Sequence, residues 1–330
     1  MVTRRKLLIG LCLVTLSSAF ATRAQQPKVS RIGILSARSR STPANPEPYF
    51  GAFVQGMREL GYVEGKNLAI EWRYADGKHE RLPGLAAELV RMKVEVIVSH
   101  ATPGTEALQR ATNTIPIVMT SFSDPVGGGF AKSLARPGGN ITGLSIMTVD
   151  LSTKQLELLK IMLPALSRVA LVMDPGMSFH PAVLRSVQAA AQTMGIQVVP
   201  VQTGNPQEIE RVFEKMAREG VNAAILAASS LYTQQRRQIA ELEVKHRVPT
   251  INPARENVEA GSLMSYGTNI ADSYRRAATY VDKILKGARP GDLPIEQPTT
   301  FHLAINAKTA KVLGLRIPPE LRLRADEVIV

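Results

Sequence analysis

The fold is decided by residues 94–112, which read VEVIVSHATPGTEALQRAT. Four of the five residues 94–98 are valine or isoleucine, with Glu95 as the exception, and this composition is typical of a buried strand. Residues 105–112 follow as a helical stretch, and a polar segment joins the two. A buried strand that leads into a helix is the unit from which sheets of parallel strands are built.

The same alternation continues on both sides of this stretch. Further strands are expected at 32–35, 68–72, 115–119, 169–173, 196–201, 223–226 and 249–251, and further helices at 50–60, 82–92, 151–162, 183–194, 209–218 and 231–246. The turn-rich segment Arg136–Asn140 separates two blocks of this rhythm. The pattern therefore predicts an α/β protein with two doubly wound parallel-sheet lobes.

A helix at 272–286 and a strand-like segment at 300–305 remain after the second block. We expect these tail elements to cross back between the lobes, so that each lobe is discontinuous in sequence. The first lobe then comprises residues 25–143 plus about 268–298, and the second comprises 144–267 plus about 299–330.

The N-terminus has the layout of a secretory signal peptide. Three basic residues at 4–6 precede the uncharged run Leu7–Ala21, and small residues suited to cleavage follow at Ala21 and Ala24. The run is short for a membrane span, which needs about 20 residues. We expect residues 1–24 to be a cleaved signal and the mature protein to be periplasmic. An uncleaved anchor is the alternative, and export by the Sec or the twin-arginine route stays open.

The net charge of the chain is +12, and +8 remains without the four basic residues of the signal. The remaining basic residues are scattered among acidic ones, which favours a solvated surface over a nucleic-acid site. The single cysteine, Cys12, lies in the apolar run of the signal, so the mature chain is expected to have none.

Sequence motifs of enzymes are absent from the chain. It contains no dinucleotide fingerprint, no phosphate-binding loop and no G-x-S-x-G elbow. The five histidines are dispersed, without the paired spacing of a zinc site. We therefore expect no catalytic residue, no metal and no cofactor.

Polar residues follow three of the expected strands, where ligands of open parallel sheets bind. In each case a capping-type residue precedes a proline: Thr102, Asp124 and Asp174. Such pairs favour a helix N-terminus or a tight turn, whose free backbone N–H groups bind carboxylates and other anions. The alternative is that these three residues only cap and turn the chain.

Segments along nearly the whole mature chain resemble one known family. They are RIGILS (31–36), FVQGMRELGYVEG (53–65), EWRYADG (71–77), LPGLAAELV (82–90), SDPVG (123–127), LARPGGNITG (134–143), LMSYGTN (263–269) and YVDKILKG (280–287). These segments are similar to the ABC transporter substrate-binding family that includes tryptophan- and tyrosine-type receptors.

The resemblance implies a type I periplasmic-binding fold, with three crossings between the lobes and a hinged cleft. It implies an extracytoplasmic receptor that captures an amino acid or a small carboxylate by hinge closure. The receptor, expected to be a monomer, would present its solute to the permease membrane subunits of an ABC importer. The alternatives are a ligand-binding sensor of the same fold and, with less support, a periplasmic hydrolase.

The resemblance also implies which residues hold the ligand at the strand ends and at a crossing. They are Ser36, Ser99, His100, Ala101, Thr102, Thr120, Ser121, Phe122, Asp124, Asp174, Ser229, Met264 and Tyr266.

Overall fold

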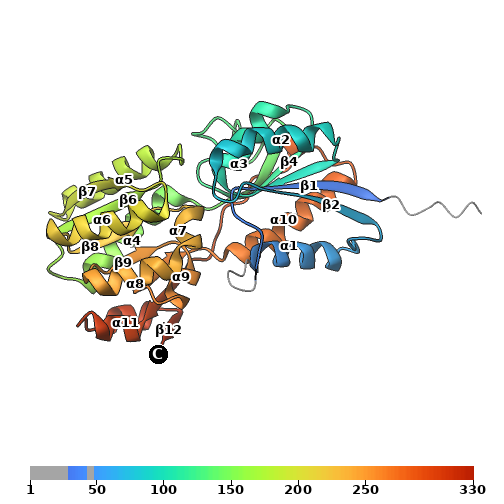
Figure 1. Ribbon diagram of the computed structural model, residues 1–330. Coiled ribbons are helices and arrows are strands. Elements are labelled where there is room, and N and C mark those ends of the chain that lie inside the picture. Colours follow the sequence, from blue (N-terminus) through green and yellow to red (C-terminus); the bar gives the residue numbers. More distant parts are fainter. Residues whose placement is uncertain (1–28, 43–47) are drawn as a thin grey trace, which may run out of the picture.

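The structure is a computed structural model that describes residues 29–42 and 48–330. The signal peptide expected at residues 1–24 lies outside the described residues. Two α/β lobes lie side by side, each built on one sheet with helices on both faces, and connecting segments join them (Figure 1). This architecture confirms the predicted fold class.

The first lobe contains a five-stranded sheet in the order β2-β1-β3-β4-β5, whose neighbouring strands are all parallel. Helices α1 and α10 pack together on one face, and α2 and α3 cover the other. The bounds are Ser30–Ser36 (β1), Pro48–Glu59 (α1), Leu68–Tyr74 (β2), Leu82–Arg91 (α2), Val96–Ser99 (β3), Ala101–Ala111 (α3), Ile117–Phe122 (β4), Ile141–Ser145 (β5) and Ile270–Leu285 (α10).

The second lobe contains a seven-stranded sheet in the order β12-β11-β10-β9-β8-β6-β7. Its strands are Arg168–Met173 (β6), Gln197–Gln202 (β7), Ala223–Leu226 (β8), Thr250–Asn252 (β9), Met264–Gly267 (β10), His302–Asn306 (β11) and Glu327–Ile329 (β12). Its helices are Thr148–Met162 (α4), His180–Thr193 (α5), Pro206–Arg218 (α6), Ser230–Gln234 (α7), Arg236–His246 (α8), Arg255–Glu259 (α9), Ala307–Val312 (α11) and Pro319–Arg324 (α12).

One strand pair of the second sheet departs from the parallel pattern. Strand β11 runs antiparallel to β10, whereas every other pair in this sheet is parallel. The chain leaves the second lobe after β10, forms α10 on the first lobe, and then returns as β11. Because it leaves and re-enters at the same end of the sheet, the two strands point in opposite directions.

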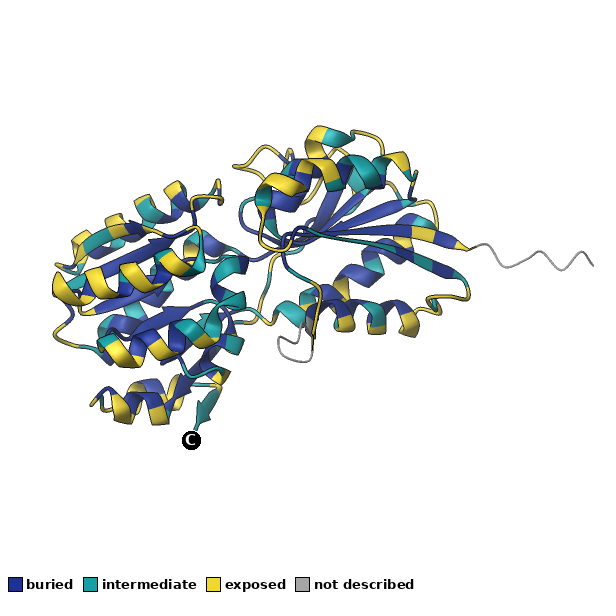
Figure 2. Cartoon of the chain, viewed as in Figure 1, coloured by how far each residue is buried: buried dark blue, intermediate teal, exposed yellow. Residues whose placement is uncertain are grey.

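The cores lie between the sheets and their helices. Strands β3 and β8 are buried at every position, as expected for parallel strands covered on both faces. Figure 2 shows the strands mostly buried and the outer faces of the helices exposed. The lobes therefore have separate cores.

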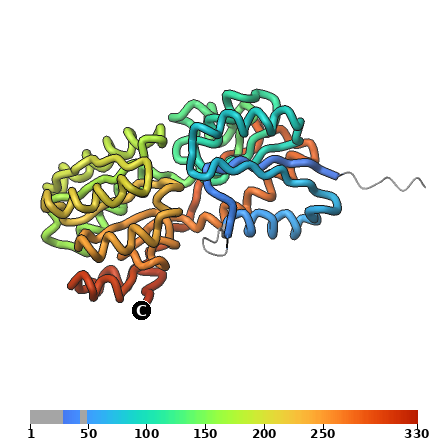
Figure 3. Tube along the Cα trace, viewed as in Figure 1, coloured from blue at the N-terminus to red at the C-terminus, as the bar shows by residue number. Residues whose placement is uncertain are grey.

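The chain passes between the lobes three times, at residues 146–147, 268–269 and 297–301 (Figure 3). Gly267 precedes the second crossing, and a Cβ atom there would lie 1.9 Å from the carbonyl oxygen of Pro253. Met147, in the first crossing, has a left-handed backbone with φ of 50°. No helix within residues 29–42 and 48–330 is long and apolar enough to cross a membrane.

Candidate functional site

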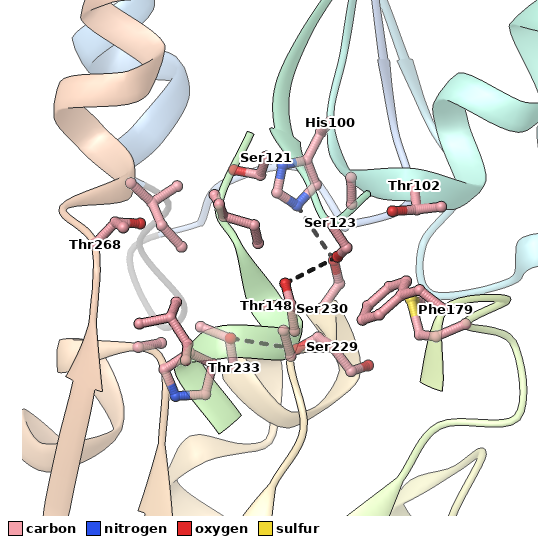
Figure 4. A pocket seen from close by; sticks show the side chains of 18 of the residues that line it. His100, Thr102, Ser121, Ser123, Thr148, Phe179, Ser229, Ser230, Thr233 and Thr268 are labelled. Carbon is pink, nitrogen blue, oxygen red and sulfur yellow. Dashed lines mark hydrogen bonds between the residues drawn. The ribbon is translucent and has the colours of Figure 1, made fainter. Parts of the chain in front are cut away.

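A cavity lies between the lobes, at the ends of strands from both sheets (Figure 4). In Figure 4, His100, Thr102 and Ser121 approach it from the first lobe, and Ser229 and Ser230 approach it from the second. The lining residues are Arg38, His100, Ala101, Thr102, Ser121, Ser123, Ile146, Thr148, Leu151, Met177, Phe179, Ala228, Ser229, Ser230, Thr233, Pro253, Ala254, Thr268 and Ile270.

Five of the residues expected at the site line this cavity. They are His100, Ala101, Thr102, Ser121 and Ser229. They come from the starts of α3 and α7 and from the end of β4, so the structure brings strand ends of both lobes to one place. Their contact with a ligand stays a prediction.

Three of the other expected residues support the cavity from behind. Ser36 Oγ accepts a hydrogen bond from the backbone N–H of Arg38 over 3.0 Å, and so shapes the loop that carries Arg38. Thr120 Oγ1 donates to the carbonyl oxygen of Ser99 over 3.1 Å, which ties β4 to the end of β3. Ser99 Oγ accepts from Thr105 Oγ1 over 2.9 Å and braces the start of α3.

Four more expected residues lie away from the cavity lining. Phe122 packs against Phe130, with their ring centroids 4.5 Å apart. Met264 belongs to the core of the second lobe, and Tyr266 stacks on a neighbouring ring at 6.0 Å. Asp124 closes a turn by accepting from the N–H of Gly127 over 2.8 Å.

The start of α3 differs from the sequence prediction. The helix begins at Ala101, four residues earlier than expected, and His100 rather than Thr102 is its N-cap. Ala101 has a left-handed φ of 61°, a strained conformation that is found most often at functional sites. The first turn of α3 therefore lines the cavity, and its backbone N–H groups carry the positive end of the helix dipole.

Two buried hydroxyl groups in the lining have no partner within the described part of the chain. Thr102 Oγ1 and Ser121 Oγ make no hydrogen bond to any residue that the structure describes. Their residues are only 3% and 6% exposed. A buried polar group left unpaired costs about 1–3 kcal/mol, so a ligand oxygen that accepts from these hydroxyls would recover that cost.

Arg38 supplies a buried positive charge to the cavity. It is 6% exposed, and its guanidinium carbon lies 5.0 Å from the centre of the Tyr49 ring. A buried cation next to helix N-termini favours an anionic group in the cavity. Arg38 was not among the residues expected at the site, although it lies two residues beyond the end of β1, and other expected residues also follow strand ends.

His100 connects the two lobes. Its Nδ1 atom contacts the hydroxyl of Tyr274 on α10, and its Nε2 atom lies 3.2 Å from Ser230 Oγ across the cleft. Burial holds the pKa of His100 well below its usual value, and the positive charge of Arg38 acts in the same direction. The imidazole is therefore neutral, with one nitrogen as donor and the other as acceptor.

The second lobe holds a paired network behind the cavity. Ser229 Oγ donates to Asp174 Oδ2 over 2.6 Å, and the N–H of Gly176 donates to Asp174 Oδ1 over 2.8 Å. The N–H of Asp174 donates to His180 Nδ1 over 3.0 Å, so Nε2 keeps its proton and donates to the carbonyl oxygen of Ala228 over 3.1 Å. Asp174, one of the expected ligand contacts, thus positions Ser229 and does not itself line the cavity.

A second pair of hydroxyls meets at the first crossing. Thr148 Oγ1, at the start of α4, donates to Ser123 Oγ at the end of β4 over 2.9 Å. Thr148 was not expected at the site, because neither the start of α4 nor its distance from β4 follows from a strand–helix pattern. The apolar part of the lining comes mainly from Ile146, Leu151, Met177, Phe179 and Ile270.

The lobes touch at the mouth of the cleft. Ser178 Oγ of the second lobe donates to Glu106 Oε1 of the first lobe over 2.5 Å. A Cβ atom at Gly176 would lie 2.3 Å from Nδ1 of His79 in the first lobe. With the His100–Ser230 contact, these approaches show a closed arrangement. Within residues 29–42 and 48–330, no group of three or more His, Cys, Asp or Glu residues could hold a metal ion.

Two parallel-sheet lobes, three crossings and a cavity between strand ends define a solute-binding protein of the type I periplasmic-binding fold. Residues 41–329 match the family model described as ABC transporter substrate binding protein, and the chain belongs to this family. The members of this family are solute-binding proteins and not enzymes.

Three comparisons add detail. The chain is 24% identical over 277 residues to a tyrosine-binding protein of Clostridioides difficile strain R20291, covering 84% of this chain and 78% of the relative. A conserved domain protein of Vibrio cholerae has a TM-score of 0.85 at 28% identity, covering 91% of this chain and 100% of that one. A Streptococcus pneumoniae ABC domain in complex with L-Trp has a TM-score of 0.84 at 25% identity, covering 92% and 100%.

Proposed function

We propose that this protein is the extracytoplasmic receptor of an ABC importer, exported by its first 24 residues. It captures an amino acid or another small carboxylate by closing its two lobes, and it hands the solute to the permease as a monomer. The lobes, with boundaries close to those expected from the sequence, rotate about the three crossings. Closure buries the solute in the cavity around His100 and Ser229.

One observation carries this proposal. The cavity contains the buried hydroxyls of Thr102 and Ser121, which lack partners among the described residues, beside the buried guanidinium of Arg38. Donors and a positive charge suit the oxygen atoms of a carboxylate. The starts of α3, α4 and α10 also border the cavity, and each contributes the positive end of a helix dipole.

The descriptions of two relatives agree with a carboxylate ligand. The related proteins from Clostridioides difficile and Streptococcus pneumoniae are named for tyrosine binding and for a complex with L-Trp. At about a quarter identity, these names support the chemical class of the ligand rather than its identity. The apolar lining, with Phe179 and Leu151, provides a surface for the hydrocarbon part of such a solute.

A thermal-shift screen of residues 25–330 tests the proposal. The panel contains the amino acids, aromatic and aliphatic carboxylates, sugars, nucleosides and purines, with sodium chloride at equal ionic strength as the control. A ligand at about 100 times its dissociation constant adds roughly 2.7 kcal/mol, which raises the melting temperature by several degrees.

A shift with amino acids or other carboxylates supports the receptor and its ligand class. A shift only with neutral solutes retains the receptor but contradicts the carboxylate. No shift from a folded sample contradicts solute capture. The importer role has its own test, because cells without this protein should lose uptake of the radiolabelled ligand; normal uptake would favour a sensor.

A further inference from the structure

A chain of three buried side chains crosses the cleft through His100. Tyr274 on α10 and His100 before α3 belong to the first lobe, and Ser230 begins α7 in the second. The Tyr274 hydroxyl contacts His100 Nδ1, and His100 Nε2 lies 3.2 Å from Ser230 Oγ. The three residues are 0%, 4% and 8% exposed, so the chain is shielded from water.

Aromatic rings hold the first two members in place. Tyr49 stacks on Tyr274 with ring centroids 5.6 Å apart, and Phe50 meets Tyr274 edge-on at 5.4 Å. Phe50 also meets His100 edge-on at 6.4 Å. Because all of these residues lie in the first lobe, the contact between Tyr274 and His100 does not depend on lobe closure.

The chemistry of the two groups gives the chain a direction. A neutral imidazole has one accepting and one donating nitrogen, and a phenol hydroxyl is a good donor. If Tyr274 donates to Nδ1, the imidazole proton stays on Nε2. When the lobes close, Nε2 donates to Ser230 Oγ.

The direction has a consequence for the ligand. In this direction Ser230 Oγ accepts from His100 and keeps its own proton, for which the described residues offer no acceptor. Ser123 Oγ is in the same position, because it accepts from Thr148 and also lines the cavity. Both hydroxyls can then donate to an oxygen atom in the cavity.

We propose that His100 is a positioning residue, whose tautomer is fixed by Tyr274 and which makes Ser230 a hydrogen-bond donor to a ligand carboxylate in the closed form. The inference rests on the proposed receptor function and specifies how the second lobe recognises the ligand. It gives His100 a role in recognition through Ser230, in addition to any direct contact.

The first test is 15N NMR of histidine-labelled protein, residues 25–330, without ligand. We expect His100 as the Nε2–H tautomer at neutral pH, and mixed tautomers in Tyr274→Phe. Tyr280→Phe is the matched control, because Tyr280 lies on the same helix and donates to the carbonyl oxygen of Pro294 away from the cavity. An Nδ1–H tautomer in the wild type would overturn the inference, since Ser230 would then donate to His100.

The second test is a double-mutant cycle on the dissociation constants of L-tyrosine, L-tryptophan and 3-phenylpropanoate. Ser230→Ala and Tyr274→Phe are each expected to weaken the binding of these carboxylates, by about tenfold for Ser230→Ala. The double variant should bind as Ser230→Ala does, because Tyr274 acts through Ser230. Additive losses would overturn the inference, since Tyr274 would then act independently of Ser230.

The outcomes separate the inference from the proposed function. If the wild type binds a neutral solute such as myo-inositol and none of these carboxylates, the inference fails and the receptor stands. If the wild type binds no solute of the larger panel, the proposed function fails with it.

Discussion

The two lobes present their polar groups to the cavity in different ways. In the first lobe, Thr102 and Ser121 bring buried hydroxyls that have no partner among the described residues. In the second lobe, Ser229 is bonded to Asp174, whose backbone N–H is bonded in turn to His180. The two first-lobe hydroxyls have unmet hydrogen-bonding capacity, whereas the network of Ser229, Asp174 and His180 is already paired.

This difference separates ligand recognition from the stability of the fold. An unpaired buried hydroxyl destabilises the free protein and gains most from a ligand, whereas a paired network stabilises the lobe with or without one. We therefore expect substitution of Thr102 or Ser121 to change affinity, and substitution of Asp174 to change the free energy of unfolding.

The largest expected effect on the free energy of unfolding comes from a buried carboxyl group in the second lobe. Glu243 on α8 is fully buried and accepts from the N–H groups of Thr250 and Leu263 over 2.9 and 3.0 Å. Burial raises its pKa to about 8, against hydrogen bonds that lower it. The folded protein thus binds this proton more tightly than the unfolded chain does.

The stability from Glu243 is complete below its usual pKa of about 4.5 and is lost as the pH rises to about 8. The free energy of unfolding should fall by about 1.4 kcal/mol per pH unit in that window. Urea denaturation between pH 5 and 8 measures the slope, which Glu243→Gln should remove. Glu241→Gln, on the exposed face of the same helix, is the control. A slope that survives in Glu243→Gln would assign it to other groups.

Asp174→Ala should lower the free energy of unfolding by about 3 kcal/mol, because it removes two hydrogen bonds to a buried carboxylate. Urea denaturation without ligand measures the loss. Asp124→Ala is the counterpart in the first lobe, where a less buried aspartate accepts one hydrogen bond. We expect it to cost about 1 kcal/mol. Equal losses at the two positions would contradict the contrast between the lobes.

Thr102→Val should leave stability unchanged or raise it by up to about 1 kcal/mol, because the methyl group replaces a hydroxyl without a partner. Its affinity for the carboxylate found in the screen should fall by about tenfold, as measured by calorimetry. Thr105→Val in the same helix is the control, because that hydroxyl donates to Ser99 and its loss should reduce stability. A Thr102→Val protein that is less stable but binds the ligand with normal affinity would contradict the role of this hydroxyl in ligand recognition.

The smallest effect is expected at the mouth of the cleft. Ser178→Ala removes an exposed contact with Glu106 and should change the equilibrium between closed and open lobes by less than about threefold. Single-molecule FRET between dyes at Gln109→Cys and Ala189→Cys, on exposed faces of α3 and α5, measures the closed fraction. A larger change would indicate that the Ser178–Glu106 contact, rather than the His100–Ser230 contact, mainly holds the lobes closed.

The alternation of strands and helices could be predicted from the sequence, because buried parallel strands have a distinctive composition. Residues 94–98 and 223–226 were expected as strands, and the structure has β3 and β8 there. The direction of β11 could not be predicted in this way. It depends on the end of the sheet at which the chain returns from the first lobe, and no local pattern records that.

The candidate site was predictable only in part, for a similar reason. The segment from His100 to Thr102 could be predicted because it follows a strand. This pattern does not predict which side chains point into the cleft. Ser99 and Thr120 turn inward and brace the strands, whereas Arg38 and Ser123 turn toward the cavity. The pair of Ser123 and Thr148 arises from the first crossing, which brings together residues of two lobes.

The hydroxyls of Thr102 and Ser121 also bear on how such a receptor acquires a new cargo. Since no part of the described fold depends on their hydrogen bonds, other small side chains at these positions would leave the lobe intact. Ligand preference could then diverge by single substitutions on one lobe, while the assembled network around Asp174 is inherited unchanged. A set of paralogues with one architecture and many cargoes would be the evolutionary outcome.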